Sequence, residues 1–141
     1  PRSVRSFASI PVVIVAYSGG YLATAWSVHH GGLTNRLRGV VLFDALYGEL
    51  DTFADWIQRQ KSAFFISTYS HSTQWRNGEL QRLLTEREIG YTTALEPRLL
   101  PGSIAFLPAS SDAAHRDFLT HAWVDDPLKD LLVRLKGYAR P

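Results

Sequence analysis

Three side chains in this sequence have the types that, brought together, allow a serine hydroxyl to attack a carbonyl carbon. Ser18 lies in the segment Ala16-Tyr17-Ser18-Gly19-Gly20, between an apolar run and a helical pattern. Asp44 ends a second apolar run, and His115 follows the apolar run 103–107 by about eight residues. A serine hydroxyl needs a base to remove its proton, and the usual base is an imidazole whose other nitrogen has a partner. The three residues therefore predict a nucleophile, its base and the carboxylate that orients the base.

Each of the three residues also has a purely structural interpretation. A Ser-Gly-Gly sequence after a strand is typical of a tight turn, or of a loop that binds phosphate at the start of a helix. Asp44 is equally suited to cap a turn or the helix near Glu49. His121 is the alternative to His115, and we expect it at the surface or at a helix cap. The remaining histidines are interpreted as structural at a helix end (His29 and His30) or as lining a pocket (His71).

The elements that must position these residues alternate between strands and helices. Four apolar runs, the first made of β-branched and small residues, predict strands that are buried on both faces of a sheet. Helical spacing follows each run, and Gly31-Gly32, Gly90 and Asp126-Pro127 are typical helix stop and start signals. The predicted strands are residues 12–16, 39–43, 63–67 and 103–107, and the predicted helices cover residues 21–28, 50–57, a segment around 80–84 and 128–135.

Four successive strand–helix units predict an α/β fold, with a parallel sheet, flanking helices and right-handed crossovers. In such a sheet the reactive groups lie just past the carboxyl ends of the strands, where several loops converge. Ser18, Asp44 and His115 each follow a different predicted strand. Segment 68–73, after the third predicted strand, is interpreted as a loop and offers no carboxylate. We therefore expect the three residues to meet at one edge of the sheet.

The segment around Ser18 resembles the nucleophile elbow of the α/β-hydrolase superfamily. The pattern there is small-x-nucleophile-x-small, because the strained turn that exposes the nucleophile leaves room only for small residues two positions away on either side. Ala16 and Gly20 are the small pair here, with alanine where glycine is commoner. The order Ser18, Asp44, His115 also agrees with the superfamily's order of nucleophile, acid and histidine. It matches the variant that carries the acid one strand earlier than most members do.

The resemblance implies a serine hydrolase, of the esterase or lipase kind. Such an enzyme cleaves an ester, thioester or amide of a small-molecule acyl substrate through an acyl-enzyme on Ser18, with no metal and no organic cofactor. The Gly19 N–H is expected to contribute to the oxyanion hole. Tyrosines close to the predicted centre indicate an apolar or aromatic acyl pocket, with Tyr17, Tyr47 and Tyr69 as its residues. We expect Trp26, by contrast, to be buried between its helix and the sheet.

The resemblance spans residues 11–135 and corresponds to the second half of the fold. We therefore interpret residues 1–141 as the C-terminal portion of a single α/β-hydrolase domain. The N-terminal portion includes the loop that supplies the other N–H of the oxyanion hole, so we expect little hydrolysis without it. Strand 12–16 becomes an unpaired apolar edge in this arrangement, and such an edge aggregates unless it is covered. We expect the N-terminal portion as a second chain or as a further part of the same polypeptide.

Composition and charge exclude several classes of function. The 141 residues are 45% hydrophobic and 20% charged, as is typical of a globular domain, and the absence of cysteine excludes a thiol nucleophile and a zinc–thiolate site. A formal net charge of +2 gives no reason to expect nucleic acid as a partner, and no apolar run is long enough to span a membrane. Two other classes remain open: a non-catalytic α/β binding or scaffolding domain with the hydrolase shape, and a flavodoxin-like module that holds a phosphate on Ser18-Gly19-Gly20.

Overall fold

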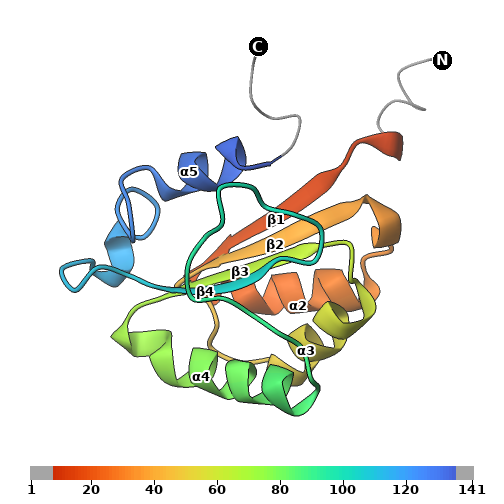
Figure 1. Cartoon of the computed structure of the whole chain (residues 1–141), viewed down its shortest axis with the longest axis horizontal. Helices are drawn as coiled ribbons and strands as arrows, with labels where there is room; N and C mark the ends of the chain where they lie inside the picture. Colours follow the sequence, from red (N-terminus) through yellow and green to blue (C-terminus); the bar gives the residue numbers. More distant parts are fainter. Residues whose placement is uncertain (1–7, 136–141) are drawn as a thin grey trace.

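Four parallel strands form the centre of the molecule. In the computed structural model, which describes residues 8–135, the strands are β1 (Val12–Tyr17), β2 (Leu37–Phe43), β3 (Phe64–Tyr69) and β4 (Ile104–Pro108). They lie side by side in the order β1-β2-β3-β4, and every neighbouring pair is parallel (Figure 1). The predicted α/β fold with a parallel sheet and strand–helix units is confirmed.

Helices cover both faces of this sheet. One face carries α2 (Tyr21–His30), α3 (Leu50–Arg59) and α4 (His71–Glu86), and the opposite face carries α5 (Pro127–Val133) (Figure 1). Two apolar clusters fill the spaces between the layers. The first includes Phe53, Phe65 and Leu80, and the second includes Phe118 and Leu131. Burial on both faces explains why β2, β3 and β4 are largely apolar runs, whereas β1, which was also predicted to be buried on both faces, is mostly only partly buried.

The register of the strands brings the candidate residues to one edge. Tyr17 at the end of β1 lies opposite Phe43 at the end of β2, and Phe43 lies opposite Thr68 near the end of β3. The chain therefore leaves the sheet at the same level after β1 and after β2. Ser18 and Asp44 are the first residues beyond those two strands, so they are neighbours in space although they are far apart in sequence.

Helix α4 begins earlier than its apolar pattern predicted. The expected helix lay around residues 80–84 with Gly90 as its end, whereas α4 starts at His71 and ends at Glu86. The interpretation of segment 68–73 as a loop was therefore wrong, because Thr68 and Tyr69 end β3 and α4 begins at His71. The first half of α4 is buried through polar side chains: Asn77 accepts a hydrogen bond from the Ser67 hydroxyl at 2.6 Å and donates one to the Thr73 carbonyl at 2.9 Å. A buried face of this kind carries no hydrophobic periodicity.

Trp26 does not pack against the sheet, so the expectation that it is buried was wrong. The side of α2 that faces the core carries Thr24 and Ala25, with Tyr21 and Val28 packed against the first cluster one turn to either side. Trp26 lies outside this stripe and is 60% exposed, with its ring 4.9 Å from that of His30.

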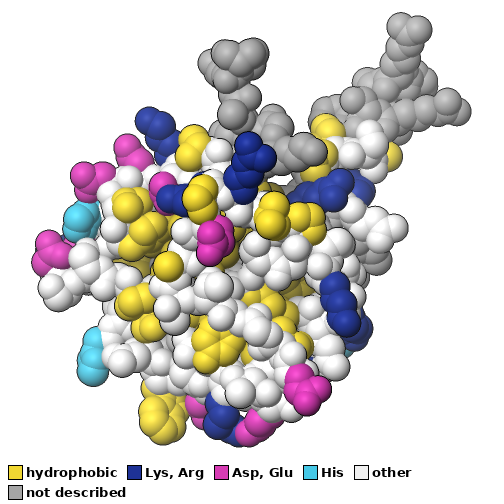
Figure 2. Space-filling view, in the orientation of Figure 1, with side chains coloured by type: hydrophobic (Ala, Val, Ile, Leu, Met, Phe, Trp, Pro, Cys, Tyr) yellow, Lys and Arg dark blue, Asp and Glu magenta, His cyan; other side chains and the backbone are white. Residues whose placement is uncertain are grey.

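Strand β1 is an edge of the sheet. Among residues 8–135 its one partner strand is β2, and Val15 on this strand is 41% exposed. Hydrophobic side chains are visible where β1 begins and in several other places on this face, with acidic and basic side chains between them (Figure 2). Of the helices within residues 8–135, none combines the length and apolar character that a membrane-crossing segment requires.

Candidate active site

Ser18 sits on a sharp turn between β1 and α2. Its backbone φ is +53°, in the left-handed region, and residues 18–20 form a single 3-10 turn before the helix starts. This conformation costs a non-glycine residue about 1–2 kcal/mol. A Cβ placed on Gly20 would lie 3.3 Å from the Cβ of Ala16, so the turn is tight enough to favour small residues at both positions. The result is a serine side chain that projects beyond the end of the strand.

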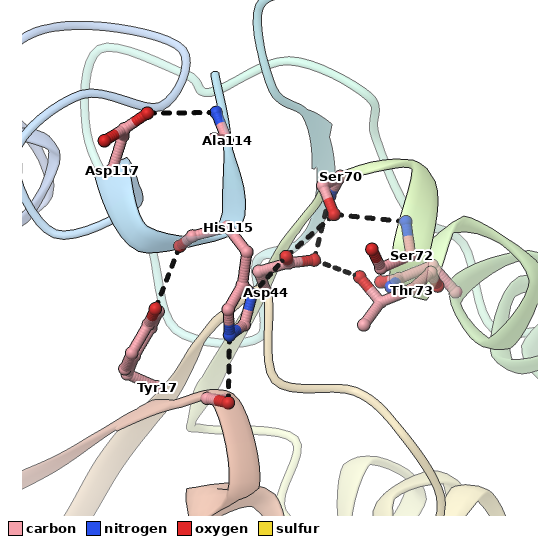
Figure 3. A network of polar contacts seen from close by, with 10 residues as sticks. Tyr17, Asp44, Ser70, Ser72, Thr73, Ala114, His115 and Asp117 are labelled. Carbon is pink, nitrogen blue, oxygen red and sulfur yellow. Dashed lines mark hydrogen bonds and ion pairs between the residues drawn. The ribbon is translucent and has the colours of Figure 1, made fainter.

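The Ser18 hydroxyl is hydrogen-bonded to His115, and His115 is hydrogen-bonded to Asp44. The Ser18 Oγ lies 2.9 Å from His115 Nε2, and the Asp44 Oδ2 lies 2.6 Å from His115 Nδ1 (Figure 3). Because an ionised carboxylate only accepts hydrogen bonds, Nδ1 must carry the proton, which leaves Nε2 free to accept the proton of Ser18. Three loops, after β1, after β2 and after β4, thus contribute one side chain each.

The Asp44 carboxylate is fully buried, and each of its oxygens has two donors. The Ser70 backbone N–H (2.9 Å) and the Thr73 hydroxyl donate to Oδ1, while the Ser70 hydroxyl (2.7 Å) and His115 donate to Oδ2. Burial on its own would raise the pKa of Asp44, but the hydrogen bonds from Ser70, Thr73 and His115 outweigh it, so the pKa lies below its usual value. Asp44 is therefore held as a carboxylate at neutral pH.

The beginning of α4 supplies most of this arrangement. Ser70 caps the helix: its hydroxyl oxygen accepts a hydrogen bond from the Ser72 N–H at 3.1 Å and donates its own proton to Asp44 (Figure 3). Since a hydroxyl has only one proton, the two roles together fix its orientation. The N-terminus of a helix also favours a negative charge nearby. The sequence reasoning missed Ser70 and Thr73, and a Ser-x-x-Thr pair at the end of a predicted strand is the signal that points to such a cap.

Two tyrosines flank the His115 imidazole, which is 35% exposed. The Tyr17 ring stacks on it, with centroids 4.9 Å apart and planes 23° apart, and the Tyr47 ring stands edge-on to it at 6.4 Å. Tyr47 also packs against Tyr21 at 6.0 Å. The pKa of Tyr47 is raised, mainly by burial. The negative charge of Asp44 and the nearby Tyr17 hydroxyl raise it further. Tyr17 and Tyr47 therefore both lie beside His115, and their place in an acyl pocket stays a prediction.

The other residues considered from the sequence lie elsewhere or remain untested. Tyr69 is half-buried and packs against the first apolar cluster. His121 is half-buried and pairs with Asp125 at 2.9 Å; this hydrogen bond raises the pKa of His121. Its other ring nitrogen lies 3.5 Å from the Ser110 hydroxyl, which donates its proton to a backbone carbonyl. A Cβ on Gly19 would meet nothing within 4 Å, so packing does not require a glycine there, and its role in an oxyanion hole stays a prediction.

The largest cavity described here lies away from Ser18, at the other end of the sheet. Within residues 8–135 no cluster of His, Asp and Glu side chains is arranged to hold a metal ion. A cavity of about 310 Å³ lies between the end of α3 and the start of β4, lined by Trp56, Phe65 and Ile104 among others. It is at the amino ends of the strands, whereas Ser18 is at their carboxyl ends.

Comparison of the chain with protein-family models, with curated proteins and with solved structures found no match. The class of protein must therefore be argued from the fold and from the contacts of Ser18, His115 and Asp44.

Proposed function

We propose that this chain carries the nucleophile, acid and histidine of an α/β-hydrolase-type serine hydrolase. Its substrate is a small molecule with an ester, thioester or amide bond, cleaved through an acyl-enzyme on Ser18. The observation that supports the proposal best is the continuous line of hydrogen bonds from Ser18 through His115 to Asp44. His115 lies 97 residues from Ser18 and 71 residues from Asp44 along the chain. A buried carboxylate with a full set of donors is costly to assemble by chance, because burying a charge is unfavourable until every lone pair is satisfied.

The reaction follows from the proton positions. His115 Nε2 accepts the proton of Ser18 as the Ser18 oxygen bonds to the carbonyl carbon of the substrate. Asp44 stabilises the imidazolium that results and prevents the imidazole from changing tautomer. The imidazolium then gives its proton to the leaving group as the tetrahedral intermediate collapses. A water molecule, deprotonated by His115, attacks the acyl-enzyme in the second half of the reaction and releases Ser18.

The oxyanion hole is the part of the proposal that needs a partner segment. The Gly19 N–H is one donor, since it follows Ser18 at the elbow, and a second donor is usual for this chemistry. The free edge of β1 is adjacent to Ser18 and carries the exposed side chain of Val15. We propose that a further strand, from the N-terminal portion of the hydrolase fold, pairs with this edge and brings the second donor with the loop beside it.

The free edge gives a direct test of the partner segment. An exposed apolar edge strand favours aggregation, so residues 1–141 alone should associate or aggregate when expressed without a partner. Sedimentation of the isolated chain is the measurement. A stable, monodisperse monomer of these residues would contradict the pairing of β1 with another segment.

The hydrolase itself is tested with an alkyl fluorophosphonate, which reacts covalently with activated serines. Peptide mapping of the complete protein should place the adduct on Ser18, with no labelling in Ser18→Ala and slow labelling in His115→Ala. The chain supplies its own matched controls, because Ser110 also lies beside a histidine that is paired with a carboxylate. Ser110→Ala and His121→Ala should label like the parent. A folded complete protein that takes up no probe would favour a non-catalytic binding domain.

A further inference from the structure

Tyr17 makes two contacts with the same distant residue. Its ring stacks on the imidazole of His115, and its hydroxyl donates a hydrogen bond to the backbone carbonyl of His115 at 3.0 Å (Figure 3). One contact orients the side chain and the other holds the main chain. Both come from the residue that directly precedes Ser18.

The segment that carries His115 needs such a restraint. Residues 109–126 contain no strand and only one 3-10 turn, His115–Asp117. Most of their backbone hydrogen bonds stay within the segment, such as that from Ser110 N to the Ala122 carbonyl at 3.0 Å. Phe118 anchors the segment in the second apolar cluster, but the His115 side chain is 35% exposed and is not fixed by burial.

Tyr17 couples this segment to the elbow. Because Tyr17 and Ser18 are consecutive, a shift of β1 moves the nucleophile and the contacts of its base together. The distance from Ser18 Oγ to His115 Nε2, 2.9 Å, is then set by a local connection rather than by the whole path through β4. Proton transfer needs this distance to stay within hydrogen-bonding range.

We infer that Tyr17 is a positioning residue, which holds His115 over Ser18 by its hydroxyl and its ring, and that it is not a substrate contact. The consequence for acyl transfer rests on the proposed function, whereas the coupling of Tyr17 to His115 does not. This inference replaces the sequence-based assignment of Tyr17 to an acyl pocket, because both ends of the side chain are engaged by His115.

Two substitutions separate the two contacts. Tyr17→Phe removes the hydroxyl and keeps the ring, and Tyr17→Leu removes both. Tyr91→Phe is the matched control, since Tyr91 is a half-buried tyrosine whose ring packs on Phe106, away from Ser18. Two measurements are made on the full chain with any partner segment present: the rate of labelling by the alkyl fluorophosphonate, and long-range ¹H–¹⁵N spectra of the imidazoles, which report the tautomer of each histidine.

The expected results differ between the variants. Tyr17→Phe labels about tenfold more slowly than the parent, as for the loss of one hydrogen bond, and His115 keeps a single Nδ1–H tautomer. Tyr17→Leu labels about a hundredfold more slowly, because the aromatic contact is lost as well. His115 then shows both tautomers, because an imidazole that moves away from Asp44 is no longer held with its proton on Nδ1. Tyr91→Phe matches the parent in both measurements.

The outcomes distinguish failure of this inference from failure of the proposed function. If both Tyr17 variants keep the parental tautomer and labelling rate, Tyr17 does not position His115. Normal labelling with a small probe, combined with slow labelling by an aromatic one, would make Tyr17 a substrate contact and overturn the inference. If no form takes up the probe but the tautomers still mix in Tyr17→Leu, the positioning role stands and the hydrolase proposal fails.

Discussion

Replacing Asp44 by asparagine tests the charge at the centre of the arrangement. An amide has one oxygen, which satisfies two donors, and an NH₂ group, which faces the other two. The Ser70 backbone N–H cannot turn away, so the amide oxygen must stay on that side. The NH₂ group then faces the Ser70 hydroxyl and His115 Nδ1. To accept from it, the imidazole must move its proton to Nε2, where it points at Ser18 and can no longer receive the serine proton.

Both activity and stability should fall. Labelling of Asp44→Asn by the fluorophosphonate should drop by about 10⁴, the size of effect seen when a histidine is held in the wrong tautomer. Two charge-assisted hydrogen bonds are lost at about 1.5–3 kcal/mol each, and relief from burying a charge offsets part of that. We expect a net loss of about 3 kcal/mol at pH 7, measured by urea unfolding with tryptophan fluorescence.

The pH dependence of this loss has a definite sign. The pKa of Asp44 is lower in the folded protein than its unfolded value of about 3.9. Its stabilising contribution is therefore complete above the unfolded value and disappears as the pH falls through the folded one. The difference between Asp44→Asn and the parent should narrow below about pH 4. Asp125→Asn is the control, because that side chain is 90% exposed and its pair with His121 should contribute little. An Asp44→Asn protein that labels within tenfold of the parent and is as stable at pH 7 would refute the reasoning.

Three further predictions concern the supports of this arrangement. Thr73→Val should lower the free energy of unfolding by about 2 kcal/mol and slow labelling about tenfold, because it removes one donor to Asp44. Thr73→Ser should keep both properties. Equal stability of the two variants in urea unfolding would contradict the role of the hydroxyl. Ser18→Gly should be more stable than Ser18→Ala by about 1 kcal/mol, since only glycine adopts a φ of +53° without strain. Identical urea midpoints of the two variants would mean that the backbone at residue 18 is not strained. Gly39→Ala should destabilise by about 1–3 kcal/mol, because its Cβ would overlap the Phe64 ring. A parental melting temperature would show that the ring moves freely.

The positions of Ser18, Asp44 and His115 could be predicted because each follows a strand with a clear signal. A continuous apolar run predicts a buried parallel strand, and the carboxyl ends of parallel strands share one edge. Once the runs were recognised, the proximity of the loops followed without any knowledge of side-chain contacts. That β1 would be an edge was predicted from the resemblance instead, and within residues 8–135 β1 pairs with β2 alone.

The supports of Asp44 could not be predicted by the same reasoning. The buried side of α4 runs through Thr73, Asn77, Leu80 and Leu84, which is helical spacing with polar residues in the first two places. A search for apolar periodicity finds only the second half of that helix. Ser70 and Thr73 therefore looked like loop residues, and their hydrogen bonds to a carboxylate 26 and 29 residues earlier depend on tertiary structure alone.

The polar first half of α4 has a physical explanation in the position of the acid. A carboxylate that follows β2 emerges beside the loop after β3, where α4 begins, and it must satisfy its lone pairs there because it is fully buried. The N-terminus of a helix offers unpaired N–H groups and a favourable field, and hydroxyl side chains add donors without adding charge. An apolar first turn would leave Asp44 short of partners. The polar residues that weaken the helical signal at the start of α4 are thus the ones that keep Asp44 ionised. The need to supply hydrogen bonds to Asp44 explains why this part of the fold was hard to predict.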